Sequence, residues 1–223
     1  ENLLREAKRQ KGKNDCDVPF ICLLDPNGDL AEYLLNNKKA SLNECWACYH
    51  SKMYTFNLEG IEVGIVPCIV GSSYAVLVAE QLFVSGCKTL ISVTSPGIIN
   101  HTESAKRFAL ITEAVRDEGT SYHYLSPGAP ARLSPQLYEK LAANKLPDDC
   151  PYFEAKSWTT DAPYRETQTA ISAMEKENVC CVEMEASALY AFATARKKNL
   201  ICFAHVTNTM AKNKVNFKKG EHF

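Results

Sequence analysis

Two carboxylates stand where an apolar run gives way to a helical pattern late in the chain. Glu183 and Glu185 flank Met184. The preceding residues 179–182 form a short apolar run that is typical of a buried strand. If the strand continues, both carboxylates lie on one face, because side chains alternate along a strand. Unpaired buried carboxylates are costly, and open α/β sheets bind ligands at the carboxyl ends of strands, so the pair is a candidate binding site.

A purely structural interpretation of the same residues is equally open. From Ala186 on, apolar residues recur at helical spacing. Glu185 would then lie in the first turn of a helix, where the helix macrodipole stabilises a negative charge by a few tenths of a kcal/mol. The pattern alone favours neither interpretation.

Length and composition limit the class of protein. The chain has 223 residues, 46% of them hydrophobic, and a formal net charge of −1. That is enough to bury an adequate core, and it argues against a nucleic-acid-binding surface or a disordered chain. The sequence lacks a run of about 20 apolar residues, so we expect no membrane span. We expect residues 1–17 to form a polar tail or surface helix, unlike a signal peptide, and residues 18–223 a single domain.

Ten cysteines are a high count for a chain of this length. Free thiols in apolar, strand-like runs behave as small hydrophobes, which fits a reducing, cytoplasmic location. Cys45 and Cys48 form a lone CxxC motif, and a structural zinc site would need a second pair at suitable spacing. We therefore predict no metal site. The cysteines that lie in apolar runs are Cys22, Cys68, Cys180, Cys181 and Cys202.

The element pattern alternates strands and helices. Strands at 61–70 and 87–93 flank a helix at 74–84 with short connections, which predicts a right-handed, parallel βαβ unit. Further buried strands are expected at 18–24 and 200–206.

Polar turns follow two of these strands. The segment from Asp25 to Gly28 has the composition of a tight turn. Thr94, Ser95 and Gly97 follow the strand at 87–93, where a turn can present hydroxyl and backbone N–H groups to a ligand. These residues join the carboxylate pair as candidate binding groups.

The stretch Val182–Tyr190 resembles the ribose-binding signature of nucleoside phosphorylase family 1. That family includes uridine phosphorylases, hexameric-type purine nucleoside phosphorylases and methylthioadenosine/adenosylhomocysteine nucleosidases. The resemblance runs from about residue 20 to 223. It implies a three-layer α/β/α fold with a mixed central sheet and a small-molecule nucleoside as ligand. Glu185 would accept hydrogen bonds from the ribose hydroxyls, Met184 would pack against the sugar, and Glu183 would lie near it.

The resemblance assigns further residues to the two ends of the nucleoside. Thr94, Ser95 and Gly97 would lie beside ribose and the nucleophile. Asn208 stands where purine-cleaving members carry the aspartate that protonates the base; uridine phosphorylases carry Asn there, and an amide cannot supply a proton. The segment 159–167 resembles the family's segment near the nucleobase, and its candidate residues are Asp161, Tyr164 and Arg165.

The phosphate side of the family's site is altered in this sequence. Asp25 matches the family's phosphate-gripping loop, but Gly28 stands at its arginine. The other two phosphate-binding arginines are also missing from their expected positions, and Gly71 alone remains of a glycine-rich turn. The ribose half of the site is therefore present and the phosphate half has diverged.

Three functions remain open at this point. The first is a nucleoside phosphorylase of the pentosyltransferase type, which cleaves the N-glycosidic bond with phosphate as co-substrate and no other cofactor. The second is a phosphate-independent nucleosidase, and the third is a non-catalytic nucleoside-binding or storage relative. Family sites are completed by a neighbouring subunit, which implies a homodimer or a trimer of dimers. The sequence does not determine whether the nucleoside carries a purine or a pyrimidine base.

Overall fold

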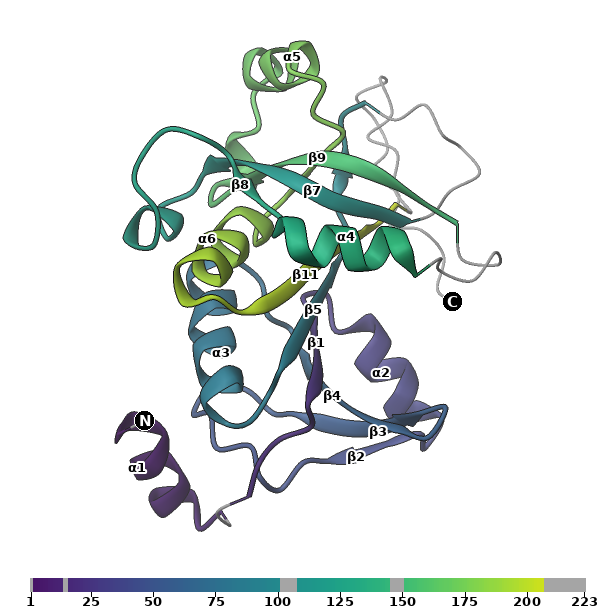
Figure 1. Cartoon of the computed structure of the whole chain (residues 1–223), viewed down its shortest axis with the longest axis vertical. Helices are drawn as coiled ribbons and strands as arrows, with labels where there is room; N and C mark the ends of the chain where they lie inside the picture. Colours follow the sequence, from purple (N-terminus) through teal and green to yellow (C-terminus); the bar gives the residue numbers. More distant parts are fainter. Residues whose placement is uncertain (1, 14–15, 101–107, 145–150, 207–223) are drawn as a thin grey trace.

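A mixed β-sheet of 11 strands runs through the described part of the molecule (Figure 1). The computed structural model describes residues 2–13, 16–100, 108–144 and 151–206. The strand order is β2-β3-β4-β1-β5-β11-β7-β9-β10-β6, and β8 pairs with β7. The strands are β1 Ile21–Asp25, β2 Ala40–Leu42, β3 Tyr54–Leu58, β4 Ile61–Pro67, β5 Thr89–Thr94, β6 Gly97–Ile98, β7 Phe108–Asp117, β8 Ala131–Arg132, β9 Tyr152–Thr160, β10 Cys181–Glu183 and β11 Asn199–His205.

The sheet contains both parallel and antiparallel strand pairs. Strand β1 pairs in parallel with both β4 and β5, and β11 extends this parallel block. Strand β7 pairs antiparallel with β11 and parallel with β9, which in turn pairs in parallel with β10. The predicted βαβ unit is confirmed, because α3 connects β4 to β5. The helices of the described residues are α1 Asn2–Lys11, α2 Asp29–Asn36, α3 Ser72–Val84, α4 Pro135–Ala143, α5 Gln168–Lys176 and α6 Ala186–Arg196.

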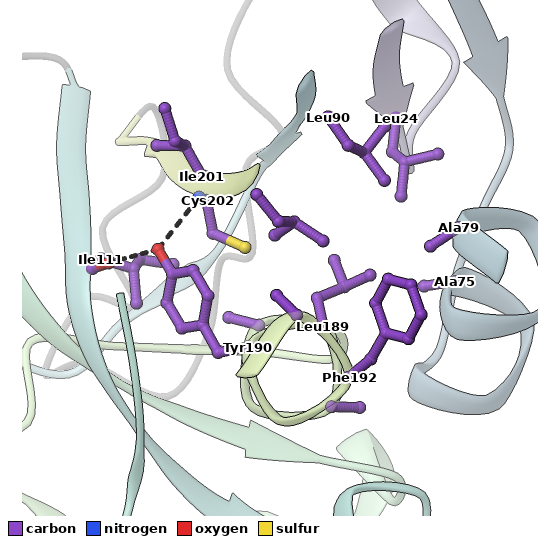
Figure 2. Close-up of a cluster of buried hydrophobic side chains, with 14 of the residues drawn as sticks. Leu24, Ala75, Ala79, Leu90, Ile111, Leu189, Tyr190, Phe192, Ile201 and Cys202 are labelled. Carbon is purple, nitrogen blue, oxygen red and sulfur yellow. Dashed lines mark hydrogen bonds between the residues drawn. The ribbon is translucent and has the colours of Figure 1, made fainter. Parts of the chain in front are cut away.

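Helices cover both faces of the sheet, which confirms the predicted α/β class. Alternate residues of β1 face opposite ways: Leu24 belongs to the core beneath α3 and α6, and Leu23 packs with α2. Helix α6 is buried at every residue from 186 to 193, because the sheet lies on one side of it and α3 on another. Figure 2 shows Leu189 and Phe192 of α6 among side chains from the strands and α3.

The N-terminal segment forms a helix that is docked onto the body of the protein. Leu4 and Ala7 of α1 pack against Ala47, and a disulfide joins Cys16 to Cys45. The sequence did not indicate this pairing, which uses one cysteine of the CxxC motif. Seven cysteines of the described residues are free, as a reducing location would favour, but a disulfide is unusual there.

None of the helices within the described ranges is long and apolar enough to cross a bilayer.

A buried tyrosine joins the last helix to two strands. The hydroxyl of Tyr190 on α6 donates to the carbonyl oxygen of Ile111 on β7 and accepts from the amide of Cys202 on β11 (Figure 2). This hydroxyl lies where β7 and β11 pair antiparallel in the centre of the sheet.

We expect Tyr190→Phe to lower the free energy of unfolding by about 1–3 kcal/mol, because a buried carbonyl and a buried N–H lose their partner. Urea denaturation measures this difference. Tyr138→Phe on α4 is the control, because the hydroxyl of Tyr138 is solvent-exposed and donates to the exposed Glu154; this variant should stay within about 0.5 kcal/mol of the wild type. Equal stabilities for the two variants would show that the buried hydroxyl contributes nothing.

Candidate functional site

A cavity of about 560 Å³ opens at the carboxyl ends of β5 and β10. The two strands end at Thr94 and Glu183, and the turn that follows η2, the short 3-10 helix Pro163–Arg165, closes another side. Ligands bind at this edge of open α/β sheets. The lining residues are Pro26, Asn27, Val70, Thr94, Ser95, Gly97, Pro163, Tyr164, Glu166, Val182, Glu183, Met184 and Glu185.

Glu185 reaches this cavity from the bend between β10 and α6. Its side chain is almost entirely buried, with the residue 3% exposed. The backbone N–H of Gly71 donates to its Oε1 at 2.8 Å, and the hydroxyl of Thr94 donates to its Oε2 at 3.4 Å. The carboxyl group is thus anchored by one good bond and one long one, and it keeps acceptor capacity for a ligand.

Glu183 has a different role, although it lines the same cavity. The hydroxyls of Ser157 and Thr159 donate to its Oε1. The backbone N–H groups of Glu185 and Ala186 donate to its Oε2, each at 2.7 Å. These amides belong to the start of α6 and lack partners within the helix. Glu185 occupies the N-cap position of α6, as the structural interpretation expects, but its own side chain makes no capping bond. The side chain that caps the helix is that of Glu183.

Burial sets the protonation of the pair. Burial raises the pKa of Glu183, and its four hydrogen bonds oppose this rise. Burial, followed by the charge of Glu183, raises the pKa of Glu185 to about 8. Since Glu183 accepts four bonds and Glu185 accepts fewer, the proton of the pair resides on Glu185 at neutral pH.

Hydroxyl groups on β9 hydrogen-bond to Glu183 and belong to a buried polar network around the carboxylate pair. Thr159 donates to Glu183 and accepts from the backbone N–H of Ser187 at 2.9 Å. The hydroxyl of Ser187 donates to Glu118 at 2.8 Å, which extends the buried network. The sequence analysis missed Ser157 and Thr159; their spacing of two, which places both on one face of a strand, is the signal that could have identified them.

Most of the predicted sugar-side residues come together. Thr94, Ser95, Gly97 and Met184 line the cavity with the carboxylate pair. Of the residues predicted from the 159–167 segment, some line the cavity and others do not. Tyr164 lines the cavity at its rim and is fully exposed.

Two predicted base-side residues do not line the cavity. Asp161 accepts a hydrogen bond from the backbone N–H of Gly119 at 2.9 Å, which ties two loops together. Arg165 is exposed and is not among the described lining residues. Asn208 lies outside the described residues.

The predicted phosphate-loop remnant holds the start of α2. Asp25 is buried and accepts from the amides of Gly28 and Ala31 at 3.1 and 2.9 Å. Gly28 has a φ of 82°, a left-handed conformation that favours glycine. Asp25 lines a neighbouring, mostly apolar cavity of about 490 Å³, which shares Asn27 and Ser95 with the first.

The charged lining of the candidate site is entirely acidic as far as the structure describes it. Glu166, Glu183 and Glu185 contribute carboxyl groups, and no Lys, Arg or His is among the described lining residues. Helix α5 begins at Gln168 with Thr167 as its N-cap, so Glu166 lies in the preceding turn and lines the cavity.

No metal centre occurs in the described ranges, where no group of three or more His, Cys, Asp or Glu side chains is arranged to hold an ion.

Removing the capping carboxylate tests the structural role of Glu183. We expect Glu183→Ala to lower the free energy of unfolding by about 2–4 kcal/mol, because two amides and two hydroxyls lose their acceptor in a buried place. Denaturation in urea measures the loss. Glu139→Ala, an exposed residue on α4, should remain within about 0.5 kcal/mol of the wild type. A similar, small effect for both substitutions would contradict the capping role.

Replacing Glu185 by glutamine tests whether its carboxyl group keeps a proton in the folded protein. Between about pH 4.5 and pH 8 the folded chain keeps a proton on Glu185 that the unfolded chain has released. The free energy of unfolding therefore falls as the pH rises through this window. In Glu185→Gln this contribution is absent, so the variant should become more stable than the wild type by roughly 2–4 kcal/mol at pH 8 and above. Urea denaturation at several pH values checks this; parallel profiles for the two proteins would contradict it.

Comparison with known proteins gives the family. Residues 21–221 match the family described as the phosphorylase superfamily. Guanosine phosphorylase from Halorubrum lacusprofundi is 25% identical over 149 residues. That match covers 67% of this chain and 61% of the relative, so the chain spans less than two thirds of that protein's length.

Solved structures show the same fold. The crystal structure of uridine phosphorylase from Vibrio fischeri ES114 complexed with 6-hydroxy-1-naphthoic acid superposes with a TM-score of 0.70 at 18% identity, over 89% of this chain and 81% of that one. A second structure of uridine phosphorylase from Vibrio fischeri ES114 gives a TM-score of 0.67, again at 18% identity, over 85% and 79%. With a family match that extends over nearly the whole sequence, the chain belongs to the phosphorylase superfamily.

Proposed function

We propose that this protein cleaves the N-glycosidic bond of a nucleoside with phosphate as co-substrate and releases the base and ribose 1-phosphate. The observation that carries the proposal is the environment of Glu185, a buried carboxyl that faces a cavity and retains free acceptor capacity. The guanosine and uridine phosphorylases to which the chain is similar support the reaction class.

Glu185 is suited to hold a sugar by two adjacent hydroxyls. A carboxylate has about four acceptor positions, and Gly71 and Thr94 occupy two of them. The 2′ and 3′ hydroxyls of ribose would donate to the remaining ones, and each charge-assisted bond contributes about 1.5–3 kcal/mol. Because only the ionised carboxylate accepts both bonds, sugar binding would displace the proton from Glu185. Met184 would pack against the sugar ring.

The same carboxylates suit the chemistry of cleavage. When the glycosidic bond breaks, positive charge develops on the sugar, as in the oxocarbenium-like transition states of glycosidases. Two fixed carboxylates in a water-poor cavity stabilise that charge more than water does, because they are already oriented toward it. Glu183 would act through position alone, since its oxygens are occupied by four donors. Ser95 and Gly97 would lie beside the incoming nucleophile.

The acidic lining favours hydrolysis as a second candidate. A phosphate dianion needs compensating charge in a buried site, and the described lining offers three carboxylates and no basic side chain. A water molecule in place of phosphate would remove that requirement. A phosphorylase would instead take its positive charge from a neighbouring subunit, as a homodimer or trimer of dimers would allow, or from chain outside the described residues.

Base release from guanosine, inosine, adenosine and uridine, measured with and without phosphate, tests the proposal. We expect release that depends on phosphate, and we expect Glu185→Gln to lower kcat/KM by at least about 100-fold, because an amide cannot hold the charge that accepts both hydroxyls and stabilises the transition state.

Glu139→Gln on the exposed side of α4 is the matched control and should leave the rate unchanged. Release without phosphate would replace phosphorolysis by hydrolysis. A wild type that binds nucleosides without releasing base would make the protein a non-catalytic binder, and full activity in Glu185→Gln would refute the assignment of the site.

A further inference from the structure

The peptide group between Met184 and Glu185 lies in the bend after β10, and side chains hold it at both ends. Its N–H, which belongs to Glu185, donates to Oε2 of Glu183 at 2.7 Å. Its carbonyl oxygen, which belongs to Met184, accepts a hydrogen bond from the hydroxyl of Ser72 at 2.7 Å. Because a peptide group is planar, two bonds at its opposite ends fix its rotation about the chain.

Ser72 reaches this bend from a distant part of the sequence. It is the first residue of α3, 112 residues before Met184, and it is completely buried. Strand β10 ends at Glu183, so the carbonyl of Met184 lies outside the strand pairing. The Ser72 hydroxyl therefore satisfies a carbonyl that the sheet does not.

The same turn also holds the carboxyl group of Glu185. The backbone N–H of Gly71 donates to its Oε1 at 2.8 Å. Gly71 has a φ of 94°, a backbone conformation that favours glycine. Two consecutive residues at the start of α3 thus place one donor on the side chain of Glu185 and another on the backbone that carries it.

The direction of the Glu185 side chain matters because of the ligand proposed for it. The two hydroxyls of a ribose diol lie on adjacent carbons, and one carboxylate has to accept from both. A rotated peptide between Met184 and Glu185 would turn the carboxylate away from this position, although the residue itself is unchanged. A displacement of about 1 Å at such a group is enough to cost on the order of 100-fold in rate.

We propose that Ser72 is a positioning residue of the candidate site, whose hydrogen bond to the carbonyl oxygen of Met184 holds Glu185 in the orientation that accepts both hydroxyls of a vicinal diol. The inference rests on the proposed function, because it requires a nucleoside whose sugar lies on Glu185. Ser72 is not among the described lining residues of the cavity. It acts through the backbone of the bend and does not touch the substrate.

Pairs of nucleosides with and without the diol test this role. Equilibrium dialysis without phosphate compares inosine with 2′,3′-dideoxyinosine, and uridine with 2′,3′-dideoxyuridine; the ratio of the two dissociation constants in a pair is the diol preference. For a base that the protein accepts, the wild type should show a preference of at least about tenfold, because two charge-assisted bonds separate the ligands. Chromatography verifies that the recovered nucleoside is intact, and if it is cleaved the ratio of kcat/KM values gives the same comparison.

Ser72→Ala should reduce the diol preference by at least about fivefold and change the affinity for the dideoxynucleoside by less than about twofold. Ser72→Cys repeats the test with a side chain of similar shape that is only a weak donor, and it should also reduce the preference. A purely structural role would lower the unfolding temperature and leave the diol preference of the folded variant unchanged.

Ser85→Ala is the matched control. Ser85 is a buried serine at the other end of α3, and its hydroxyl has no hydrogen-bond partner among the described residues. This variant loses the same atom from the same helix and should keep the wild-type diol preference. Thermal unfolding verifies that each variant is folded.

A full diol preference in Ser72→Ala and Ser72→Cys would overturn the inference, as would an equal loss of preference in Ser85→Ala. Failure of both Ser72 variants to fold would make the bond structural and would overturn it as well. These results would leave the proposed function intact, because the wild type would still select the diol. A wild type that binds no nucleoside, or that ignores the diol, would overturn the proposed sugar site on Glu185 and this inference with it.

Discussion

The burial of two carboxyl groups side by side is the constraint on which the candidate site depends. Glu183 and Glu185 are 5% and 3% exposed, and like charges in a buried place repel each other. The fold answers this in two ways. It surrounds Glu183 with four hydrogen-bond donors, and burial together with the charge of Glu183 raises the pKa of Glu185 to about 8.

This arrangement explains why α6 begins where it does. The first amides of the helix donate to Glu183, so the helix start and the capping carboxylate stabilise each other. Helix α6 is in turn enclosed between the sheet and α3, and Tyr190 bonds it to β7 and β11. A helix held on so many sides keeps the neighbouring Glu185 in one position, as a binding group must be.

The candidate cavity differs in charge from the phosphate site that the family resemblance implies. Gly28 stands at a position where the resemblance predicts an arginine, and Asp25 stabilises the start of α2. The described lining is acidic, with Glu166 as a third carboxyl. Such a lining favours ligands that donate hydrogen bonds.

Local patterns in the sequence determined the fold class and the position of the carboxylate pair. Hydrophobic periodicity located β1, α3, β5 and β11 to within a few residues, because a buried face repeats with the period of its own element. The motif around Met184 predicted which residues form the sugar-binding side of the candidate site. The sequence could not show which of the two carboxylates caps the helix, since Glu183 and Glu185 have the same side chain and are only two residues apart.

The tertiary structure alone decided which carboxylate caps the helix and which keeps acceptor capacity toward the cavity. Two of the four donors to Glu183 come from β9, more than 20 residues earlier in the chain, and the amide that anchors Glu185 belongs to Gly71. The same holds for the disulfide between Cys16 and Cys45 and for Asp161, which accepts a hydrogen bond from a neighbouring loop. Each of these outcomes depends on contacts between segments distant in sequence, and local periodicity carries no information about such contacts.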